Sequence, residues 1–196
     1  MIFEELKSAF IRNNLDIDEE KVSKLKDYWD ILLFYQNRIH LFSKKSPKEE
    51  LARQFFDIVL LNVFLPNYKE LVDAGAGAGF VGIILSILNP KKQYLLVERS
   101  KKKGDFLDVV RIKLDISNIE IFITDLEHFN SEADVVVSKA SCMRDLLENK
   151  MMELIKVGGI LVHFTGSTLP PPYKNYPFKN PFRDNISYLS VLERVV

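Results

Sequence analysis

Apolar positions in the first 66 residues recur at the spacing of amphipathic helices. Asp18 is a suitable N-cap for the second of these helices, because its side chain can accept a hydrogen bond from the first helical turn. Pro66 ends the region, which contains no glycine. The pattern therefore predicts an all-helical N-terminal segment. The expected helices are residues 2–12, 19–39 and 46–61.

From residue 69 onward, short apolar runs alternate with helical patterns. Strands joined through helices indicate a parallel sheet with helices on both faces and right-handed crossovers. Gly158 and Gly159 are expected to form the turn that follows the helix of residues 143–155. The expected strands are 71–72, 93–98, 119–123, 134–138 and 160–164, and the expected helices are 101–114, 143–155 and one that begins near Gly79.

The alternation of strands and helices stops after Phe164. The stretch from Thr168 to Pro181 contains five prolines, which excludes a helix. Residues 186–192 alternate between apolar and polar side chains, so they are expected to form a final antiparallel strand of a short hairpin. We expect a helical cap and a doubly wound α/β domain. Their expected ranges are 1–66 and 67–196.

A glycine-rich stretch, LVDAGAGAGFVG at residues 71–82, joins the first expected strand to a helix. Glycine adopts positive φ easily and allows a ligand to approach the backbone, because it has no Cβ. The following helix presents unpaired N–H groups at its N-terminus. Asp73 would lie at the carboxyl end of the strand, where open α/β sheets bind ligands. The stretch therefore predicts a nucleotide-binding loop with a carboxylate at its entrance.

Two cofactor classes fit this loop. Residues 77–82 match the dinucleotide pattern G-x-G-x-x-G, in which a pyrophosphate binds the helix N-terminus. Residues 73–79 match the acid-x-G-x-G-x-G loop of S-adenosylmethionine-dependent methyltransferases, which need an acidic group near a cationic amino group. We favour the second, and hence a Rossmann-like class I methyltransferase fold, because Asp73 supplies that acid. A tight turn that only packs the helix on the strand is the less favoured structural alternative.

Further candidate residues follow the later strands. Glu98 ends the second strand, where a carboxylate accepts hydrogen bonds from ribose hydroxyls. Leu126, through its backbone, and Glu127 follow the third strand, where methyltransferases meet adenine. Lys139 ends the fourth strand and would face the methyl acceptor, with a solvated surface lysine as the alternative. The basic stretch of residues 38–45 could contact a phosphate backbone, although a solvated, charged turn is the more common explanation of such a stretch. Its candidate residues are Arg38, Lys44 and Lys45.

Composition limits the partners that the chain can attract. Lys and Arg together number 27, as do Asp and Glu, so any attraction to nucleic acid must come from local patches. The single cysteine excludes an internal disulfide, and the histidines lack zinc-ligand spacing with it, so no metal is indicated. The N-terminus does not resemble a signal peptide and no apolar run approaches about 20 residues. We expect a cytoplasmic monomer without a membrane partner.

Several segments together resemble the RsmG family, also called glucose-inhibited division protein B. The helical segment 28–41 is similar to the family's LLxWNxxINLT helix end, and the glycine loop to its DLGSGAGFPGI sequence, including Phe80 and Gly82. Residues 101–107 resemble its xxKRxxFL helix, and residues 136–140 its VxSRA segment. The resemblance covers residues from about 20 to 165.

The resemblance implies a bacterial methyltransferase that uses S-adenosylmethionine to make 7-methylguanine in small-subunit ribosomal RNA. It implies cofactor contacts from Asp73 and the loop residues Gly75, Gly77, Gly79 and Phe80, joined by Glu98, Leu126, Glu127 and Lys139. Lys139 is also the expected acceptor-side catalytic residue, where the family usually has arginine.

Other departures from the family remove cations on the acceptor side. Asp125 replaces a basic residue, and Thr165 replaces a lysine. Two alternatives are therefore kept: a relative without catalysis that binds cofactor or RNA, and a nicotinamide-dependent oxidoreductase. The second is disfavoured by Asp73 and by the lack of a clear catalytic Tyr-Lys or His-Asp set.

Overall fold

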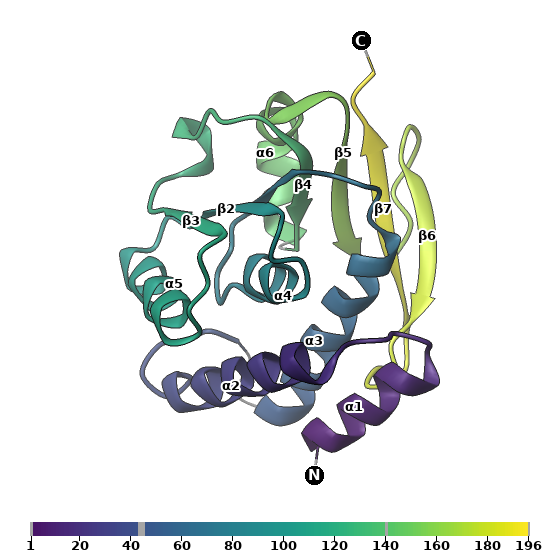
Figure 1. The fold of residues 1–196 in the computed structure, drawn as a ribbon. Coiled ribbons are helices and arrows are strands. Elements are labelled where there is room, and N and C mark those ends of the chain that lie inside the picture. The colour runs from purple at the N-terminus through teal and green to yellow at the C-terminus, as the bar shows by residue number, and fades with distance from the viewer. Residues whose placement is uncertain (1, 43–45, 140, 196) are drawn as a thin grey trace.

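The structure, a computed structural model, describes residues 2–42, 46–139 and 141–195, with the backbone alone for residues 141–146 (Figure 1). The described chain begins with three helices, continues with alternating strands and helices, and ends with three consecutive strands. In chain order the elements are α1 (Ile2–Arg12), α2 (Glu19–Tyr35), α3 (Pro47–Phe64), β1 (Glu70–Ala74), α4 (Phe80–Leu88), β2 (Gln93–Val97), α5 (Lys101–Lys113), β3 (Ile119–Phe122), the 3₁₀ helix η1 (Leu126–His128), β4 (Ala133–Ser138), α6 (Ser141–Glu153), β5 (Ile155–Thr165), β6 (Lys174–Lys179) and β7 (Ile186–Glu193).

The three N-terminal helices form where the apolar spacing predicts them. Asp18 caps α2 as expected, since its Oδ1 accepts a hydrogen bond of 2.9 Å from the backbone N–H of Lys21. Pro47 occupies the first turn of α3, where a missing N–H costs nothing. The helix α2 ends at Tyr35, however, and not at Ile39 as the apolar pattern suggests.

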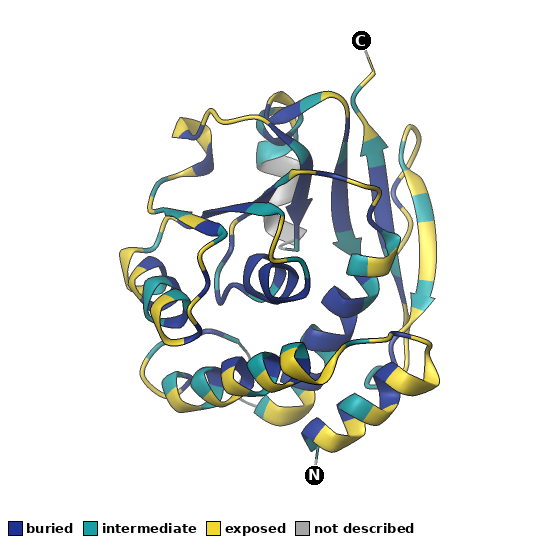
Figure 2. Ribbon diagram, viewed as in Figure 1, coloured by how far each residue is buried: buried dark blue, intermediate teal, exposed yellow. Residues whose placement is uncertain are grey.

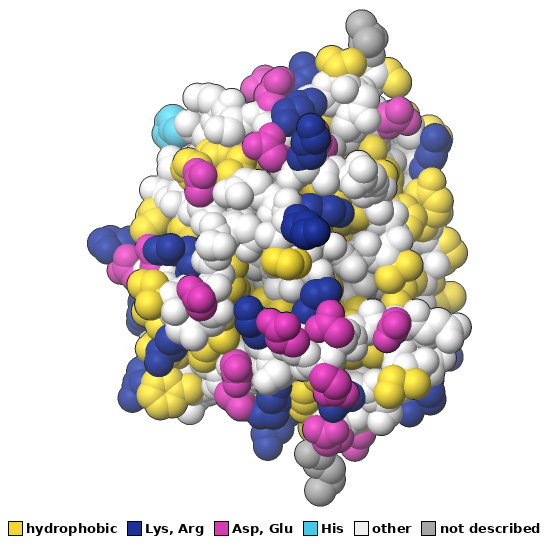
Figure 3. All heavy atoms as spheres, in the orientation of Figure 1, with side chains coloured by type: hydrophobic (Ala, Val, Ile, Leu, Met, Phe, Trp, Pro, Cys, Tyr) yellow, Lys and Arg dark blue, Asp and Glu magenta, His cyan; other side chains and the backbone are white. Residues whose placement is uncertain are grey.

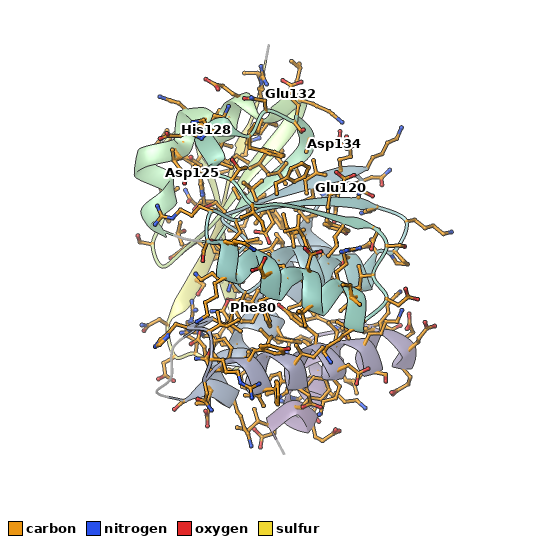
Figure 4. The ribbon with its side chains drawn as sticks, turned by 90° about the vertical axis from the view of Figure 1, so that its left-hand side faces the viewer. Phe80, Glu120, Asp125, His128, Glu132 and Asp134 are labelled. Carbon is orange, nitrogen blue, oxygen red and sulfur yellow. The ribbon has the colours of Figure 1, made fainter. Side chains whose placement is uncertain are left out.

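The sheet contains seven strands in the order β3-β2-β1-β4-β5-β7-β6. The first five of these are parallel to their neighbours, whereas β7 pairs antiparallel with both β5 and β6. The prediction of a doubly wound, mostly parallel sheet is therefore confirmed. Because the parallel strands share a direction, their carboxyl ends lie together on one side of the sheet. Figure 4 shows Asp125 and His128 on that side, whereas Glu120 and Asp134 lie near the starts of their strands.

Successive residues of the central strands belong to two separate cores. Leu71, Leu96 and Val135 pack with helices α1 to α5 on one face of the sheet. Val72 and Val136 pack on the other face, beneath α6 and η1. The first core continues without interruption into the N-terminal helices, and Figure 2 shows α4 buried at its centre. The N-terminal helices thus cover α4 and share its core.

Two C-terminal features differ from the sequence prediction. Gly158 and Gly159 do not form an exit turn but lie inside β5, where the register against β4 shifts in a bulge. Gly158 has φ of 81°, and a Cβ on Gly159 would lie 2.5 Å from the carbonyl oxygen of Asp134. The proline-rich stretch contains strand β6, which tolerates Pro177 because it forms the edge of the sheet.

Charged side chains of both signs are mixed on the face shown in Figure 3. This agrees with the equal numbers of acidic and basic residues. Among the helices that the structure describes, none has the length and apolar character needed to cross a membrane.

Gly82 is required by the close packing of α4 on β2. A Cβ at this position would lie 2.5 Å from Cδ1 and 2.6 Å from Cγ of Leu96, which is fully buried. We expect Gly82→Val to lower the free energy of unfolding by about 1–3 kcal/mol, because the core has no room for the added atoms. Urea denaturation measures this loss. The control Gly166→Val should change stability much less, since a Cβ there meets no atom within 4 Å.

Candidate functional site

The glycine loop turns sharply between β1 and α4. Gly75, Gly77 and Gly79 have φ values of 78°, 60° and 84°, which side chains with a Cβ rarely adopt. The N–H of Gly75 donates to the carbonyl of Val97, so the loop is fixed to the end of β2. A Cβ on Gly79 would also lie 2.5 Å from Cδ2 of Leu107. The loop conformation thus depends on these glycines, as the sequence motif predicts.

The Asp73 side chain links the end of β1 to the start of α4 across the glycine loop. Its carboxylate is almost fully buried, and Oδ2 accepts a hydrogen bond of 2.9 Å from the N–H of Gly82 in the first turn of α4. Burial raises the pKa of Asp73 to about 7, with a further contribution from the charge of Glu98, while the Gly82 hydrogen bond and the charge of Lys139 oppose the rise. A cationic ligand beside this carboxyl would favour its ionised form.

Glu98 joins the end of β2 to the same loop. Its Oε2 accepts a hydrogen bond of 2.8 Å from the N–H of Gly77, and its Oε1 accepts one of 2.8 Å from the N–H of Ser100. Each carboxylate oxygen has a second lone pair that can accept from a ligand hydroxyl. The buried Glu98 is therefore oriented by the backbone at the position that the sequence indicates.

Tyr28 supports the loop from the N-terminal helices, a role that the sequence analysis missed. Its hydroxyl donates a hydrogen bond of 2.6 Å to the carbonyl of Ala78, and the side chain is fully buried. Burial, together with the negative charge of Asp73, raises the pKa of Tyr28 well above its usual value, so the hydroxyl stays protonated. Helix α2 is thereby tied directly to the loop.

A cavity of about 470 Å³ opens beside the glycine loop. Its walls combine the loop and the start of α4 with residues from α3, from the ends of β4 and β5, and from β7 and the segment before it. This volume lies in the range of small-molecule sites. The lining residues are Leu41, Phe42, Glu50, Gln54, Asp57, Asp73, Gly75, Ala76, Gly77, Ala78, Phe80, Val81, Lys139, Phe164, Thr165, Gly166, Arg183 and Ser187.

Lys139 reaches this cavity from the end of β4, so it is not a solvated surface lysine. Its Nζ lies 3.3 Å from Oδ2 of Asp57, donates a hydrogen bond to Oε1 of Gln54, and lies 5.2 Å from the ring centre of Phe164. Burial lowers the pKa of Lys139, although the negative charge of Asp57 opposes that change. The ammonium is thus held in place by two side chains of α3.

Asp57 connects three distant parts of the chain, and the sequence analysis also missed it. The side chain is 2% exposed, and its Oδ1 accepts a hydrogen bond of 2.8 Å from Nδ2 of Asn180. Its Oδ2 lies 3.3 Å from Lys139 and 3.9 Å from the guanidinium of Arg183. A single acid within the apolar run of α3 was the available signal, because a buried charge needs partners.

The other predicted cofactor residues divide between the cavity and its surroundings. Phe80 lines the cavity, with its ring centre 6.0 Å from that of Phe42. Figure 4 shows Phe80 at the start of α4, on the side of the sheet that faces the N-terminal helices. Leu126 is buried in the core of the opposite face, while Glu127 is exposed, and neither lines the cavity.

The predicted phosphate-contacting residues lie away from the cavity where they are described. Arg38 is exposed and its guanidinium lies 4.5 Å from the ring centre of Phe34. Its carbonyl accepts a hydrogen bond of 2.8 Å from Nζ of Lys102, which comes from α5. Lys44 and Lys45 lie outside the described residues.

The geometry of loop and cavity can now be compared with known proteins. The family model described as "GidB: rRNA small subunit methyltransferase G" matches residues 21–183. The chain belongs to this family. The RsmG family model therefore covers the glycine loop and every residue of the cavity except Ser187, and it confirms the family resemblance noted in the sequence.

Curated members of the RsmG family include proteins named ribosomal RNA small subunit methyltransferase G. The protein from Fusobacterium nucleatum is 35% identical over 116 residues, which are 59% of this chain and 50% of that protein. The chain therefore matches only half of that relative's length. The protein from Borrelia turicatae is 31% identical over 159 residues, covering 75% of this chain and 72% of the relative.

A solved structure supports the fold class. The crystal structure of TYW2 from M. jannaschii, which was determined in complex with AdoMet, has a TM-score of 0.55 and 17% sequence identity. The match covers 79% of this chain and 78% of that protein. The predicted class I methyltransferase fold is therefore confirmed.

The buried carboxyl of Asp73 predicts a pH-dependent effect of Asp73→Asn on stability. The pKa of Asp73 is about 7 in the folded protein and lies near its ordinary value of 3.8 in the unfolded chain, so the protonated form stabilises the fold, fully so below about pH 4. This contribution is lost as the pH rises through about 7. Asparagine cannot ionise, so the variant should gain stability relative to wild type between pH 4 and pH 8, by the order of a few kcal/mol. Urea unfolding at both pH values measures the change.

The matched control is Asp125→Asn, which alters an exposed aspartate after β3. This substitution removes no buried charge, so at pH 8 it should change the free energy of unfolding much less than Asp73→Asn does. If Asp73→Asn had the same effect at both pH values, the assigned burial of the Asp73 charge would be wrong.

Proposed function

We propose that the protein transfers a methyl group from S-adenosylmethionine to N7 of a guanine in small-subunit ribosomal RNA. One observation carries the proposal: a single cavity joins Asp73 of the glycine loop to Lys139 at the expected acceptor side. Membership of the RsmG family supports the reaction, as do the names of its curated members. The lining aromatic rings, among them Phe80, suit a planar base.

The residues of the loop fit S-adenosylmethionine, which supplies a methyl group bound to a sulfonium. The carboxylate of Asp73 lies at the cavity wall, where it would attract the cationic methionine portion of the cofactor. A Cβ on Gly77 would meet only one atom within 4 Å, so this side of the loop is open for close approach of a ligand. Glu98 would accept from the ribose hydroxyls, and the backbone near Leu126 would border the adenine.

The protein's main contribution to the reaction would be alignment. N7 of guanine already has a free lone pair, so its methylation needs no general base. The walls formed by Phe80 and by α3 would hold the base in line with the methyl group, and Lys139 would contact its acceptor side. The absence of a catalytic acid–base pair from the sequence motifs agrees with such a mechanism.

The nicotinamide alternative conflicts with the geometry of the loop. A dinucleotide would place its pyrophosphate against the N-terminus of α4. There the N–H of Gly82 already donates to Asp73, and an ionised Asp73 would repel the phosphates. The other alternative, a relative without catalysis, is favoured by the ion pair that Lys139 makes with Asp57.

Titration calorimetry with S-adenosylhomocysteine and, separately, with NAD tests the cofactor class. We expect binding of S-adenosylhomocysteine alone, and about tenfold or more weaker binding by Asp73→Asn at pH 8, because a charge-assisted contact is lost. Glu98→Gln should also weaken binding. The control Glu120→Gln, at the opposite end of the sheet, should bind like wild type (Figure 4).

Methylation of small ribosomal subunits, followed by mass spectrometry of the nucleosides, tests the acceptor. The proposal requires 7-methylguanosine as the product. Binding of NAD alone would overturn the cofactor assignment. Binding of S-adenosylhomocysteine without methylation would favour the relative without catalysis.

A further inference from the structure

A row of polar groups lines the cavity wall formed by α3 and Lys139. Gln54 lies at the centre of this row: its Oε1 accepts from the ammonium of Lys139, and its Nε2 donates a hydrogen bond of 2.5 Å to Oε1 of Glu50. These two contacts fix the orientation of the Gln54 amide, because an ammonium only donates and a carboxylate only accepts. The row therefore has a donor end at Lys139 and an acceptor end at Glu50.

Both ends of the row have unused hydrogen-bonding capacity. The ammonium of Lys139 has three N–H donors, and its described partners are Gln54 and Asp57. The carboxylate of Glu50 has about four acceptor positions, and its described donors are Gln54 and Arg53. A ligand in the cavity can therefore accept from Lys139 and donate to Glu50.

Glu50 is suited to accept hydrogen bonds from a ligand in the cavity. Its side chain is only 14% exposed, and it lines the cavity. Burial acts to raise the pKa of Glu50, but the hydrogen bonds from Arg53 and Gln54 outweigh burial and leave the pKa below its usual value. The group is therefore ionised at neutral pH and cannot donate a hydrogen bond.

Aromatic rings border the same space. Phe42 and Phe80 line the cavity with ring centres 6.0 Å apart, and Phe164 lines it beside the ammonium of Lys139. Aromatic faces with polar groups at their edges are the combination that binds an unstacked base. A planar ligand that lies against these rings would direct its edge toward the polar row.

We propose that Glu50 selects guanine as the methylated base by accepting hydrogen bonds from N1–H and the N2 amino group. This inference rests on the proposed function, in which N7 of guanine faces the methyl donor. On the base, O6 lies next to N7, and the N1–H and N2 donors follow it. Lys139 donates to O6, so the donor and acceptor ends of the row match the order of groups on guanine.

Adenine presents the opposite pattern to the same row. Its N6 amino group is a donor beside N7 and faces the donor Lys139, while its N1 is an acceptor and faces the acceptor Glu50. Both contacts would leave polar groups unpaired inside the cavity, which disfavours adenine. Inosine is a subtler probe, because it retains O6 and N1–H and lacks only the N2 amino group.

Methylation of small-subunit RNA that carries guanine or inosine at the modified position tests the role of Glu50. The position is first located with the wild-type protein, and the two RNAs are then assembled by ligation. We expect wild type to prefer guanine by about tenfold, because a carboxylate loses one charge-assisted hydrogen bond with inosine. In Glu50→Ala the rate on guanine should fall by about tenfold to a hundredfold, and the preference should fall toward one.

Glu49→Ala is the matched control, because it removes an exposed carboxylate from the same helical turn. It should retain the wild-type rate and base preference. S-adenosylhomocysteine affinity should be unchanged within about twofold in both variants. Both should also unfold in a single cooperative thermal transition, with a lower midpoint for Glu50→Ala because Arg53 and Gln54 lose a partner. The conservative variant Glu50→Gln, which can still accept a hydrogen bond, should restore part of the preference.

The methylation experiment separates a failure of the proposed function from a failure of the role proposed for Glu50. If wild type methylates no guanine, the proposed function is wrong and this inference falls with it. If wild type methylates guanine but does not distinguish it from inosine, only the role of Glu50 is overturned. The same holds if Glu50→Ala lowers both rates equally, or if it loses S-adenosylhomocysteine binding, since these results indicate a structural role.

Discussion

The buried carboxylate of Asp73 is the constraint on which the site depends. It lies near the end of β1 and accepts a hydrogen bond from the N–H of Gly82, so it joins the end of this strand to the first turn of α4. Removing a charge from water is costly, and here the cost appears as a pKa near 7. The compact loop between these residues then requires positive φ at three glycines. The glycines of the sequence motif, the positive φ values of the loop and the raised pKa of Asp73 thus all follow from the way this loop folds around one buried carboxyl.

The N-terminal helices complete this arrangement from the other side. Tyr28 of α2 donates to the loop carbonyl of Ala78, and α3 supplies Asp57 and Gln54 to hold Lys139. The glycine loop and the cavity wall at Lys139 therefore rest on the same group of helices, which shares one hydrophobic core with the sheet. A change in the position of α3 would alter both walls of the cavity together. This explains why the segment before the α/β domain contributes to the site as well as to the fold.

Local patterns in the sequence predict most of the fold, because helices and buried strands have characteristic apolar spacing. The glycine loop is predicted for the same reason: its residues are adjacent in the chain and their conformational requirements are local. The cavity wall around Lys139 could not be predicted in this way. Asp57, Lys139 and Arg183 are far apart in sequence and meet only through the tertiary fold. The bulge at Gly158 was missed because glycine pairs fit turns and bulges alike.

The charge balance of the chain affects how it would bind RNA. With 27 basic and 27 acidic residues, the protein has no net charge to attract a phosphate backbone over long distances. Under the proposed function, local contacts would then supply the affinity for RNA, and the cavity would discriminate between bases. Transfer of a methyl group moves positive charge from the sulfonium to the base, so nearby carboxylates stabilise the product side of the reaction. In the proposed function Asp57 and Glu50 would lie on that side. Asp57 pairs there with Lys139 and Arg183, and Glu50 pairs with Arg53. Under the proposed function, these two carboxylates would thus suit a cationic base within the cavity.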